Sequence, residues 1–207
     1  GQPYARYSDD IIVFANSEDE ANRNRLQISD FLADYGLSVN KNKEQLVRPG
    51  QAWDFLGISY CGGKIDLSRI TKDKLKGKIR RKSRALRRWM LRKGAEPERA
   101  MKALIRVFDR KFYEGGDAND LTWSRWFFPL INSSEGLKEI DSYLQLYIRY
   151  VATGRFGHAN YRVDYQTLKR LGYRSLVHEY YSSKKCDRIT RAKILRETQR
   201  KTWQKSN

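Results

Sequence analysis

Residues 4–15 read YARYSDDIIVFA, which is two short apolar runs on either side of a polar turn. The run after the turn, Ile-Ile-Val-Phe, is β-branched and aromatic, as is typical of a buried strand. Asp9 and Asp10 occupy the turn itself. An aspartate pair in an ordinary exposed turn does not need an apolar strand directly behind it. The pattern therefore predicts a β-hairpin that presents two adjacent carboxylates at a fixed place.

Two adjacent carboxylates on a rigid hairpin fit phosphoryl transfer assisted by two metal ions. In this reaction, divalent ions about 3.5–4 Å apart stabilise the attacking and the leaving oxygens. Mg²⁺ takes oxygen ligands, usually one or two carboxylates together with substrate phosphates. We therefore expect Asp9 and Asp10 to be catalytic ligands of Mg²⁺.

Charge is unevenly distributed along the chain. Over all 207 residues the formal net charge is +18, but residues 1–67 carry seven Lys and Arg against ten Asp and Glu. The remainder has a net charge of +21. An acidic part that can hold metal is thus followed by a basic part that can hold a polyanion, which suits an enzyme acting on nucleic acid. On charge alone, a ribosomal or chromatin-type binding protein remains the alternative.

The acidic part predicts a mixed α+β structure. Ser17 and Glu20 have the spacing of a capping box, and the helix that they begin is expected to end at Gly36. The last two expected strands flank Cys61-Gly62-Gly63 and should form a hairpin. Strands are expected at 37–39, 45–47, 55–60 and 64–67.

The basic part reads as helical throughout, with the boundary between the two parts at 62–69. Its helix starts are marked by capping residues and by Pro97, and two of its helix ends by glycine. Helices are expected from Thr71 to about Lys93, from Pro97 to Tyr113, from Ser134 to about Gly154, around Leu168, around Val177, and from about Cys186 to Trp203.

The first of these helices is unusually rich in positive charge. Between Arg69 and Lys93, thirteen residues are Lys or Arg, and only Asp73 is acidic. A merely solvated charged helix usually has interleaved acids, so their scarcity favours contacts with phosphates. Such contacts bind any sequence and weaken with salt. The candidate phosphate-binding residues are Arg80, Arg81, Arg84, Arg87 and Arg88.

Aromatic residues and cysteines have more ordinary interpretations. Six aromatic residues at helical spacing are more typical of a core than of a base-stacking surface, although the second role fits them too. Cys61 and Cys186 have no neighbours at metal-ligand spacing and predict reduced thiols in a cytoplasmic protein. No run of 18 apolar residues occurs, so we expect no membrane span. The six aromatic residues are Trp123, Trp126, Phe127, Tyr143, Tyr147 and Tyr150.

Three short motifs resemble those of one polymerase family. Residues 6–11 resemble the Tyr-x-Asp-Asp box of reverse transcriptases, in the form found in bacterial group II intron and retron-type enzymes, with Ser8 where Ala is usual. Residues 36–43, GLSVNKNK, resemble the family's Gly-Leu-x-x-Asn-x-x-Lys block. Phe55-Leu56-Gly57 resembles its primer-grip hairpin. The three motifs follow in family order over about fifty residues.

The resemblance implies the C-terminal part of a right-hand polymerase palm at 1–67 and an all-α basic thumb or RNA-binding region at 68–207. Asp9 and Asp10 would bind Mg²⁺, and Lys43 would approach the incoming triphosphate. The implied partners are an RNA template, a DNA or RNA primer and dNTPs. The residues implied near the primer or nucleotide are Tyr7, Ser8, Phe55, Leu56 and Gly57.

The chain also departs from the family pattern. Reverse transcriptases take a further metal-binding Asp and their nucleotide-binding fingers from sequence upstream of the Tyr-x-Asp-Asp turn, which begins here at Tyr7. Glu44 follows Lys43 where the family commonly has Thr. We therefore expect the chain to be a fragment, or to complete its site with another polypeptide, and to be inactive alone.

Two other functions fit the same sequence. A maturase-like protein would keep the fold and clamp a structured intron or non-coding RNA, although the intact Asp9 and Asp10 speak against loss of catalysis. A reverse transcriptase of a bacterial antiphage system would make DNA from an unusual template or primer. The chain has no recognisable nuclease or integrase module that chooses between these roles.

Overall fold

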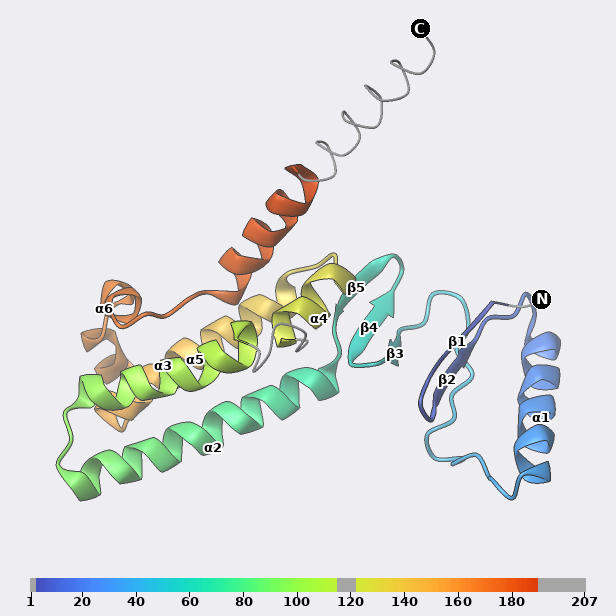
Figure 1. The fold of residues 1–207 in the computed structure, drawn as a ribbon, viewed down its shortest axis with the longest axis horizontal. Coiled ribbons are helices and arrows are strands. Elements are labelled where there is room, and N and C mark those ends of the chain that lie inside the picture. Colours follow the sequence, from blue (N-terminus) through green and yellow to red (C-terminus); the bar gives the residue numbers. More distant parts are fainter. Residues whose placement is uncertain (1–2, 115–121, 190–207) are drawn as a thin grey trace, which may run out of the picture. The chain divides into compact units, whose positions relative to one another are not determined.

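The computed structural model describes residues 3–114 and 122–189 and has an α+β fold. The chain divides into two compact units, Gly1–Lys64 and Ile65–Asn207. The first unit contains strands and one helix, and the second is predominantly helical (Figure 1). The α+β class predicted from the sequence is confirmed.

The first unit begins with a β-hairpin and a helix. Strands β1 (Tyr4–Tyr7) and β2 (Asp10–Val13) pair antiparallel, and helix α1 spans Glu18–Asp34. The Ser17 hydroxyl accepts the backbone N–H of Glu20 at 3.1 Å, which is the predicted N-cap. Gly36 has φ +71° and follows the C-cap residue, so the predicted end of this helix is also confirmed.

The segment between α1 and the next sheet contains no strand, so the strands predicted at 37–39 and 45–47 are wrong. A strand needs a neighbour that accepts and donates its backbone hydrogen bonds, and these two segments lack one among the described residues. Local bonds hold the segment instead. The backbone N–H of Lys43 donates to the Asn40 oxygen at 2.9 Å, and Arg48 pairs with Glu18 at 2.8 Å.

A three-stranded sheet follows, with the order β3-β4-β5. The predicted hairpin over residues 61–63 is confirmed, because β4 and β5 flank these residues. The continuous strand predicted at 55–60 is wrong, because Leu56 and Gly57 have φ of +48° and +84° and form a tight turn. The strands are β3 (Trp53–Phe55), β4 (Ile58–Cys61) and β5 (Lys64–Leu67).

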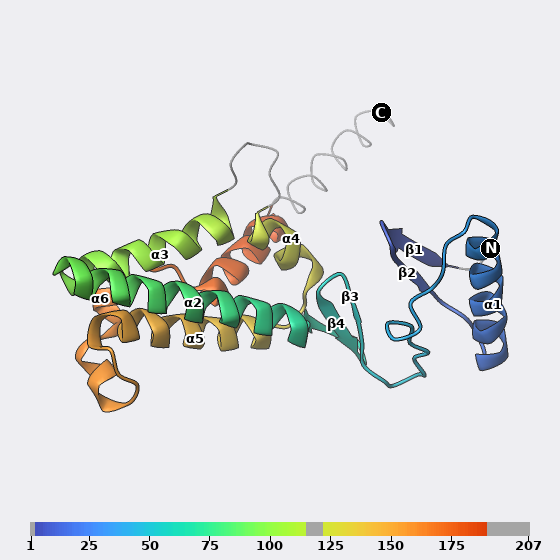
Figure 2. The same ribbon diagram turned by 90° about the horizontal axis from the view of Figure 1, so that it is seen from below.

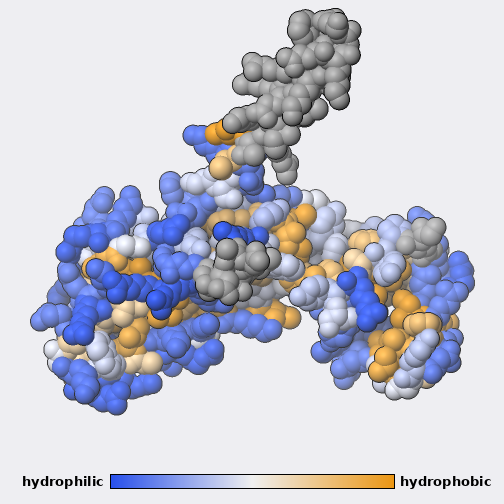
Figure 3. All heavy atoms as spheres, in the orientation of Figure 1, coloured by the Kyte–Doolittle hydropathy of each residue, from blue (hydrophilic) through white to orange (hydrophobic). Residues whose placement is uncertain are grey.

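Apolar side chains of the first unit remain accessible to solvent. None of the residues 3–64 is buried, and the first buried residue along the chain is Leu67. Phe31 on α1 and Tyr35 at its C-cap are 61% and 70% exposed. Apolar patches lie on the surface of this unit (Figure 3). The unit therefore has no closed hydrophobic core within its described residues.

The second unit has a closed helical core. Helices α2, α3 and α5 lie side by side (Figures 1 and 2). They bury residues such as Ile79, Leu104 and Ile148, all with no exposed surface. The helices are α2 (Arg69–Lys93), α3 (Pro97–Tyr113), α4 (Trp123–Leu130), α5 (Glu135–Thr153), η1 (His158–Arg162), α6 (Tyr165–Arg170) and a helix over 176–189.

Helix boundaries agree with the prediction in most places and differ in two. Helix α3 has the predicted bounds, and Gly94 and Gly154 end α2 and α5 as expected. Helix α2 is capped by Ser68, whose hydroxyl accepts the N–H of Thr71 at 3.2 Å, so the prediction of Thr71 as its cap is wrong. Residues 176–189 form one helix through Cys186, where a separate helix was predicted to begin. The part of the predicted last helix that lies beyond residue 189 is outside the described residues.

The start of α5 is fixed by the carboxylate of Asp66 in strand β5. Both Asp66 carboxylate oxygens accept the N–H of Gly136, at 3.1 and 3.2 Å, and one accepts the Ser133 hydroxyl at 2.8 Å. A Cβ at Gly136 would lie 2.6 Å from Asp66 Oδ1 and 3.1 Å from the Leu67 Cβ. This close approach explains a glycine in the first turn of a helix.

Gly136→Ala should therefore destabilise the chain, by about 1–3 kcal/mol, because the methyl group displaces Asp66. Gly77→Ala in α2 is the matched control. Its Cβ would meet only the end of the Arg81 side chain, at 3.4 Å, and alanine is the better helix former by about 1 kcal/mol. Urea unfolding measures both variants. Equal effects of the two substitutions would contradict the packing described for Gly136.

Candidate active site and nucleic-acid interface

The two adjacent aspartates lie where the first hairpin reverses direction. Tyr7 pairs with Asp10 in the β1–β2 ladder, which leaves Ser8 and Asp9 as a two-residue turn. Ser8 has φ +56°, and the Arg6 Nε donates to the Ser8 carbonyl oxygen at 2.8 Å. A short turn closed by a ladder and a side-chain bond gives the two carboxylates a defined backbone position.

The carboxylates of Asp9 and Asp10 are available to a ligand. Both residues are exposed, and neither forms an ion pair with a described residue. Within 3–114 and 122–189, no group of three or more His, Cys, Asp and Glu side chains could hold a metal ion. The pair therefore supplies two carboxylates, which fits the way Mg²⁺ is bound together with substrate phosphates.

Aromatic contacts connect this hairpin to the sheet of the same unit. Phe14 follows β2, and its ring meets Trp53 edge-on with the centroids 6.2 Å apart. Trp53 in turn packs on Tyr60 at 5.1 Å. The hairpin is thus linked to β3 and β4 through one edge-on and one tilted ring contact.

The other predicted active-site residues lie in separate turns of the first unit. Lys43 is exposed at the end of the 41–43 turn, and no hydrogen bond or ion pair joins its ammonium group to Asp9 or Asp10. Phe55 ends β3, and Leu56 and Gly57 form the turn into β4. Asp9 and Asp10 are adjacent in the first hairpin, and Lys43 belongs to a different turn.

Most of the candidate arginines of α2 point to solvent without an ion pair. Arg80, Arg81, Arg84 and Arg88 are exposed, and none pairs with an acidic residue in the described part of the chain. The ion pairs that α2 forms with acidic residues lie near the beginning of the helix. There, Lys72 and Lys76 both bind Glu139 of α5, which lowers the pKa of that carboxyl through the hydrogen bonds from the two lysines.

Arg87 differs from its neighbours, because it caps α5. Its guanidinium donates to the carbonyl oxygens of Val151 at 3.0 Å and Ala152 at 2.6 Å. These carbonyls lie in the last turn of α5, where cations complement the helix dipole and satisfy free acceptors. The partners are more than sixty positions away in sequence, so no local signal distinguishes Arg87 from the other arginines.

The aromatic residues of the second unit are mostly packing residues. Phe127 and Tyr147 are 8% and 6% exposed, and the other four members of the predicted set are half-buried. The core interpretation is therefore confirmed for Phe127 and Tyr147. Phe156 was not singled out from the sequence, yet it is 53% exposed and stacks on Tyr150.

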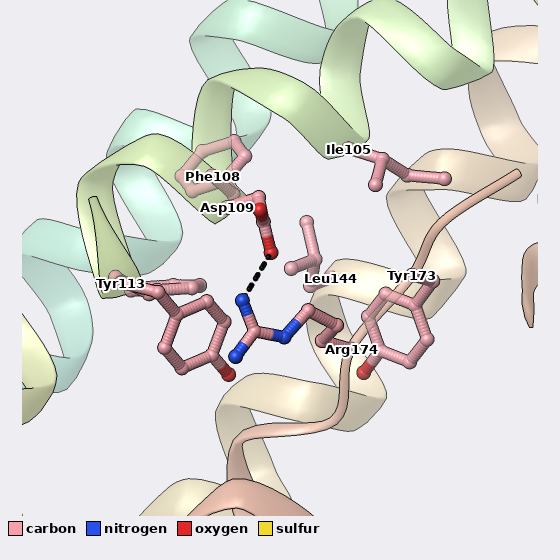
Figure 4. A pocket seen from close by; sticks show the side chains of 8 residues that line it. Ile105, Phe108, Asp109, Tyr113, Leu144, Tyr173 and Arg174 are labelled. Carbon is pink, nitrogen blue, oxygen red and sulfur yellow. Dashed lines mark ion pairs between the residues drawn. The ribbon is translucent and has the colours of Figure 1, made fainter.

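A small hollow lies between α3, α5 and residues 173–174 (Figure 4). The Arg174 guanidinium lies 3.6 Å from the Asp109 carboxylate and 4.1 Å from the centre of the Tyr113 ring. Burial raises the pKa of Asp109, and the charge of Arg174 opposes this shift. The remaining lining is largely apolar, including Ile105 and Leu144. This arrangement joins α3 to the 173–174 segment and is structural.

Residues 1–60 match the family model described as reverse transcriptase (RNA-dependent DNA polymerase). The matched segment contains the Asp9–Asp10 hairpin, the 41–43 turn and the β3–β4 turn. The match supports a nucleotidyltransferase of the reverse-transcriptase type. No curated protein matches the chain. No helix among the described residues is both long enough and apolar enough to cross a lipid bilayer.

Proposed function

We propose that this chain is the palm-and-thumb part of an RNA-directed DNA polymerase of the bacterial group II intron and retron-like lineage. The observation that carries the proposal is the exposed Asp9–Asp10 pair on a tight hairpin turn, inside the segment that matches the reverse-transcriptase family model. The template would be RNA, the primer DNA or RNA, and the substrates dNTPs.

In the proposed site, the carboxylates of Asp9 and Asp10 hold Mg²⁺. Bound Mg²⁺ would supply charge stabilisation for the attacking and leaving oxygens of nucleotidyl transfer. A further carboxylate, from outside this chain, would complete the ligand set. Tyr7 and Ser8, next to the pair on the hairpin, would line the primer terminus.

Two other turns of the first unit would contact the substrates. The Lys43 ammonium is exposed and unpaired with Asp9 and Asp10, so it is available to the phosphates of an incoming nucleotide. The β3–β4 turn, formed by Leu56 and Gly57 after Phe55, would support the primer strand. Helix α2 would follow the duplex through phosphate contacts, because the exposed Arg80, Arg84 and Arg88 have no acidic partner in the described part of the chain.

The direct assay of the proposal is template-dependent extension of a primer by the complete polymerase. We expect dNTP incorporation on an RNA template in Mg²⁺ and none after chelation of the metal. Incorporation that is independent of template or of divalent metal would contradict the proposed function.

The role of α2 predicts a loss of salt-dependent binding when its arginine stripe is neutralised. Arg80, Arg84 and Arg88 are spaced four residues apart and are all exposed, so they share one face of the helix. Changing all three to Gln should weaken binding of RNA–DNA duplexes of unrelated sequence about equally. The slope of log affinity against log salt should flatten by roughly 0.9 per lost phosphate contact, the value for DNA duplexes.

A matched control comes from α3, where Lys102, Arg106 and Arg110 have the same spacing and are also exposed. Their change to Gln removes the same charge and should alter the slope less. Arg87 is left intact, because its loss would uncap α5. An unchanged slope in the α2 variant would contradict phosphate binding by α2. A loss confined to one folded RNA would favour the maturase-like alternative.

A further inference from the structure

An exposed aromatic ring lies just beyond the end of α5. Gly154 ends the helix with φ +72°, and Gly157 has φ +105°, so Phe156 lies on a short loop between two glycines. The Phe156 and Tyr150 rings are parallel within 8°, with centroids 4.7 Å apart. Phe156 also meets Tyr147 edge-on at 5.3 Å. With 53% of its surface exposed, the ring is held in place by its neighbours and still accessible.

The loop that carries Phe156 is fixed by polar contacts at both ends. The Thr153 hydroxyl donates to Asn160 Oδ1 at 2.8 Å, and Asn160 is buried. The Arg149 Nε donates to the Val163 carbonyl oxygen at 2.8 Å. Arg87 holds the last carbonyls of α5. Binding at Phe156 would therefore cost little ordering of the loop.

The surroundings of this ring are positively charged. Residues 147–163 contain no Asp or Glu, and neither does α2 from residue 79 to its end. The nearest acid along the chain, Asp164, is engaged as the N-cap of α6. Burial raises the pKa of the Tyr147 hydroxyl, a hydrogen bond with Tyr143 adds to the shift, and the charges of Arg84 and Arg80 oppose it. On α2, the Lys76 ammonium lies 5.5 Å from the centre of the Tyr143 ring, and Arg87 donates to the carbonyl oxygens of Val151 and Ala152. Arg80 and Arg84 lie between these two positions on α2, beside the stretch of α5 that contains the aromatic cluster beneath Phe156.

We propose that Phe156 stacks an unpaired base of a single-stranded nucleic acid whose phosphates are held by Arg84 and Arg80. An aromatic ring framed by cations and free of acids is the recurring arrangement for such strands, because every base offers a π face and every linkage a phosphate. A base inside a duplex is already stacked on both sides, so an exposed ring selects unpaired nucleotides. This site shares Arg80 and Arg84 with the phosphate contacts proposed for a duplex, but it goes beyond the proposed polymerase function, because Phe156 selects unpaired bases and the site needs neither metal nor Asp9.

Charge also argues against a second copy of this chain as the occupant. Residues 68–207 carry a net charge of +21, so two such surfaces repel each other, whereas a polyanion is attracted. The positive charge of the surface and the accessible ring of Phe156 together favour a nucleic acid as the occupant of the site.

The test is equilibrium binding of the 207-residue chain to a labelled oligothymidylate and to an abasic strand of the same length. Phe156→Ala should weaken binding of oligothymidylate roughly tenfold and leave binding of the abasic strand unchanged. Phe156→Leu keeps an apolar side chain but removes the π face, and it should lose nearly as much. Phe156→Trp should bind at least as tightly as the unmodified chain.

Leu91→Ala is the matched control. Leu91 is 63% exposed on α2, the helix that carries Arg80 and Arg84. Its truncation should change neither the affinity for oligothymidylate nor the affinity for the abasic strand. Thermal melting of each Phe156 variant shows that the fold is retained, and Phe156→Leu serves where Phe156→Ala is unstable. Unchanged affinity of Phe156→Ala and Phe156→Leu for oligothymidylate, or an equal loss on the abasic strand, would overturn the proposal. The proposal would also be overturned if Phe156→Ala weakened binding to phosphatidylserine vesicles but not binding to oligothymidylate. The Asp9→Asn chain should bind both strands as tightly as the unmodified chain. Failure of the polymerase assay would therefore not decide the outcome of this binding test.

Discussion

Replacing Asp9 by Asn in the complete polymerase should reduce RNA-templated primer extension by about a thousandfold or more. The change keeps the size of the side chain and removes a charged oxygen ligand, and a metal ion contributes several kcal/mol to stabilising phosphoryl transfer. Asp9 is exposed and has no ion pair in the described part of the chain, so the substitution has no structural cost. Affinity for the primer–template should stay within a few-fold, because a metal ligand and not a phosphate contact is lost.

Asp34→Asn provides the matched control for this experiment. Asp34 is an exposed carboxylate at the end of α1 in the same unit, so its change removes the same charge. Extension by this variant should remain close to normal. Nearly normal extension by Asp9→Asn in Mg²⁺ would rule out the proposed catalytic site, whereas lost duplex binding would point to a structural role of the hairpin.

The largest effect on stability is expected at Asp141 of α5, which is only 5% exposed. Its carboxylate accepts the Tyr173 hydroxyl at 2.8 Å and the Ser175 hydroxyl at 2.6 Å. It also accepts the backbone N–H groups of Leu176 and Val177 at 2.9 and 3.1 Å. One side chain of α5 thus caps the helix over 176–189 and fixes the segment before it.

Asp141→Ala should lower the free energy of unfolding by about 3 kcal/mol or more, because it leaves four donors, two of them buried and two partly buried, without acceptors. Asp141→Asn should cost less, since its amide oxygen still accepts while its NH₂ group faces donors. Asp73→Ala removes only an exposed pair to Arg69 at 3.7 Å and should change stability by less than about 0.5 kcal/mol. Urea unfolding compares the three variants. A similar small loss in all of them would show that the 176–189 helix is held by other contacts.

Features decided by neighbouring residues could be predicted from the sequence. The hairpin beside the aspartates, the cap at Ser17 and the ends of helices at glycine all depend on residues within a few positions. Asp10, which was expected in the turn, is the first residue of β2. The adjacency of Asp9 and Asp10 could be predicted for the same reason.

Features that depend on distant residues could not be predicted. The expected strands at 37–39 and 45–47 have suitable composition but no neighbouring strand with which to pair. Ser68 and Thr71 can both cap α2, and the choice follows from the burial of Ser68, which is 2% exposed. The capping role of Arg87 depends on residues of α5, and the exposure of Phe156 depends on the packing of that helix end.

The absence of buried residues between 3 and 64 has a consequence for how the chain unfolds. Cooperative melting, its heat-capacity change and its denaturant m-value scale with the surface that unfolding exposes. Among the described residues, that surface belongs mainly to 65–114 and 122–189. A calorimetric transition therefore reports the helical unit and is almost insensitive to the hairpin that carries Asp9. A substitution could disorder that hairpin and leave the melting temperature unchanged. Amide hydrogen exchange across the β1–β2 ladder detects such a change directly, because it reports the opening of individual backbone bonds.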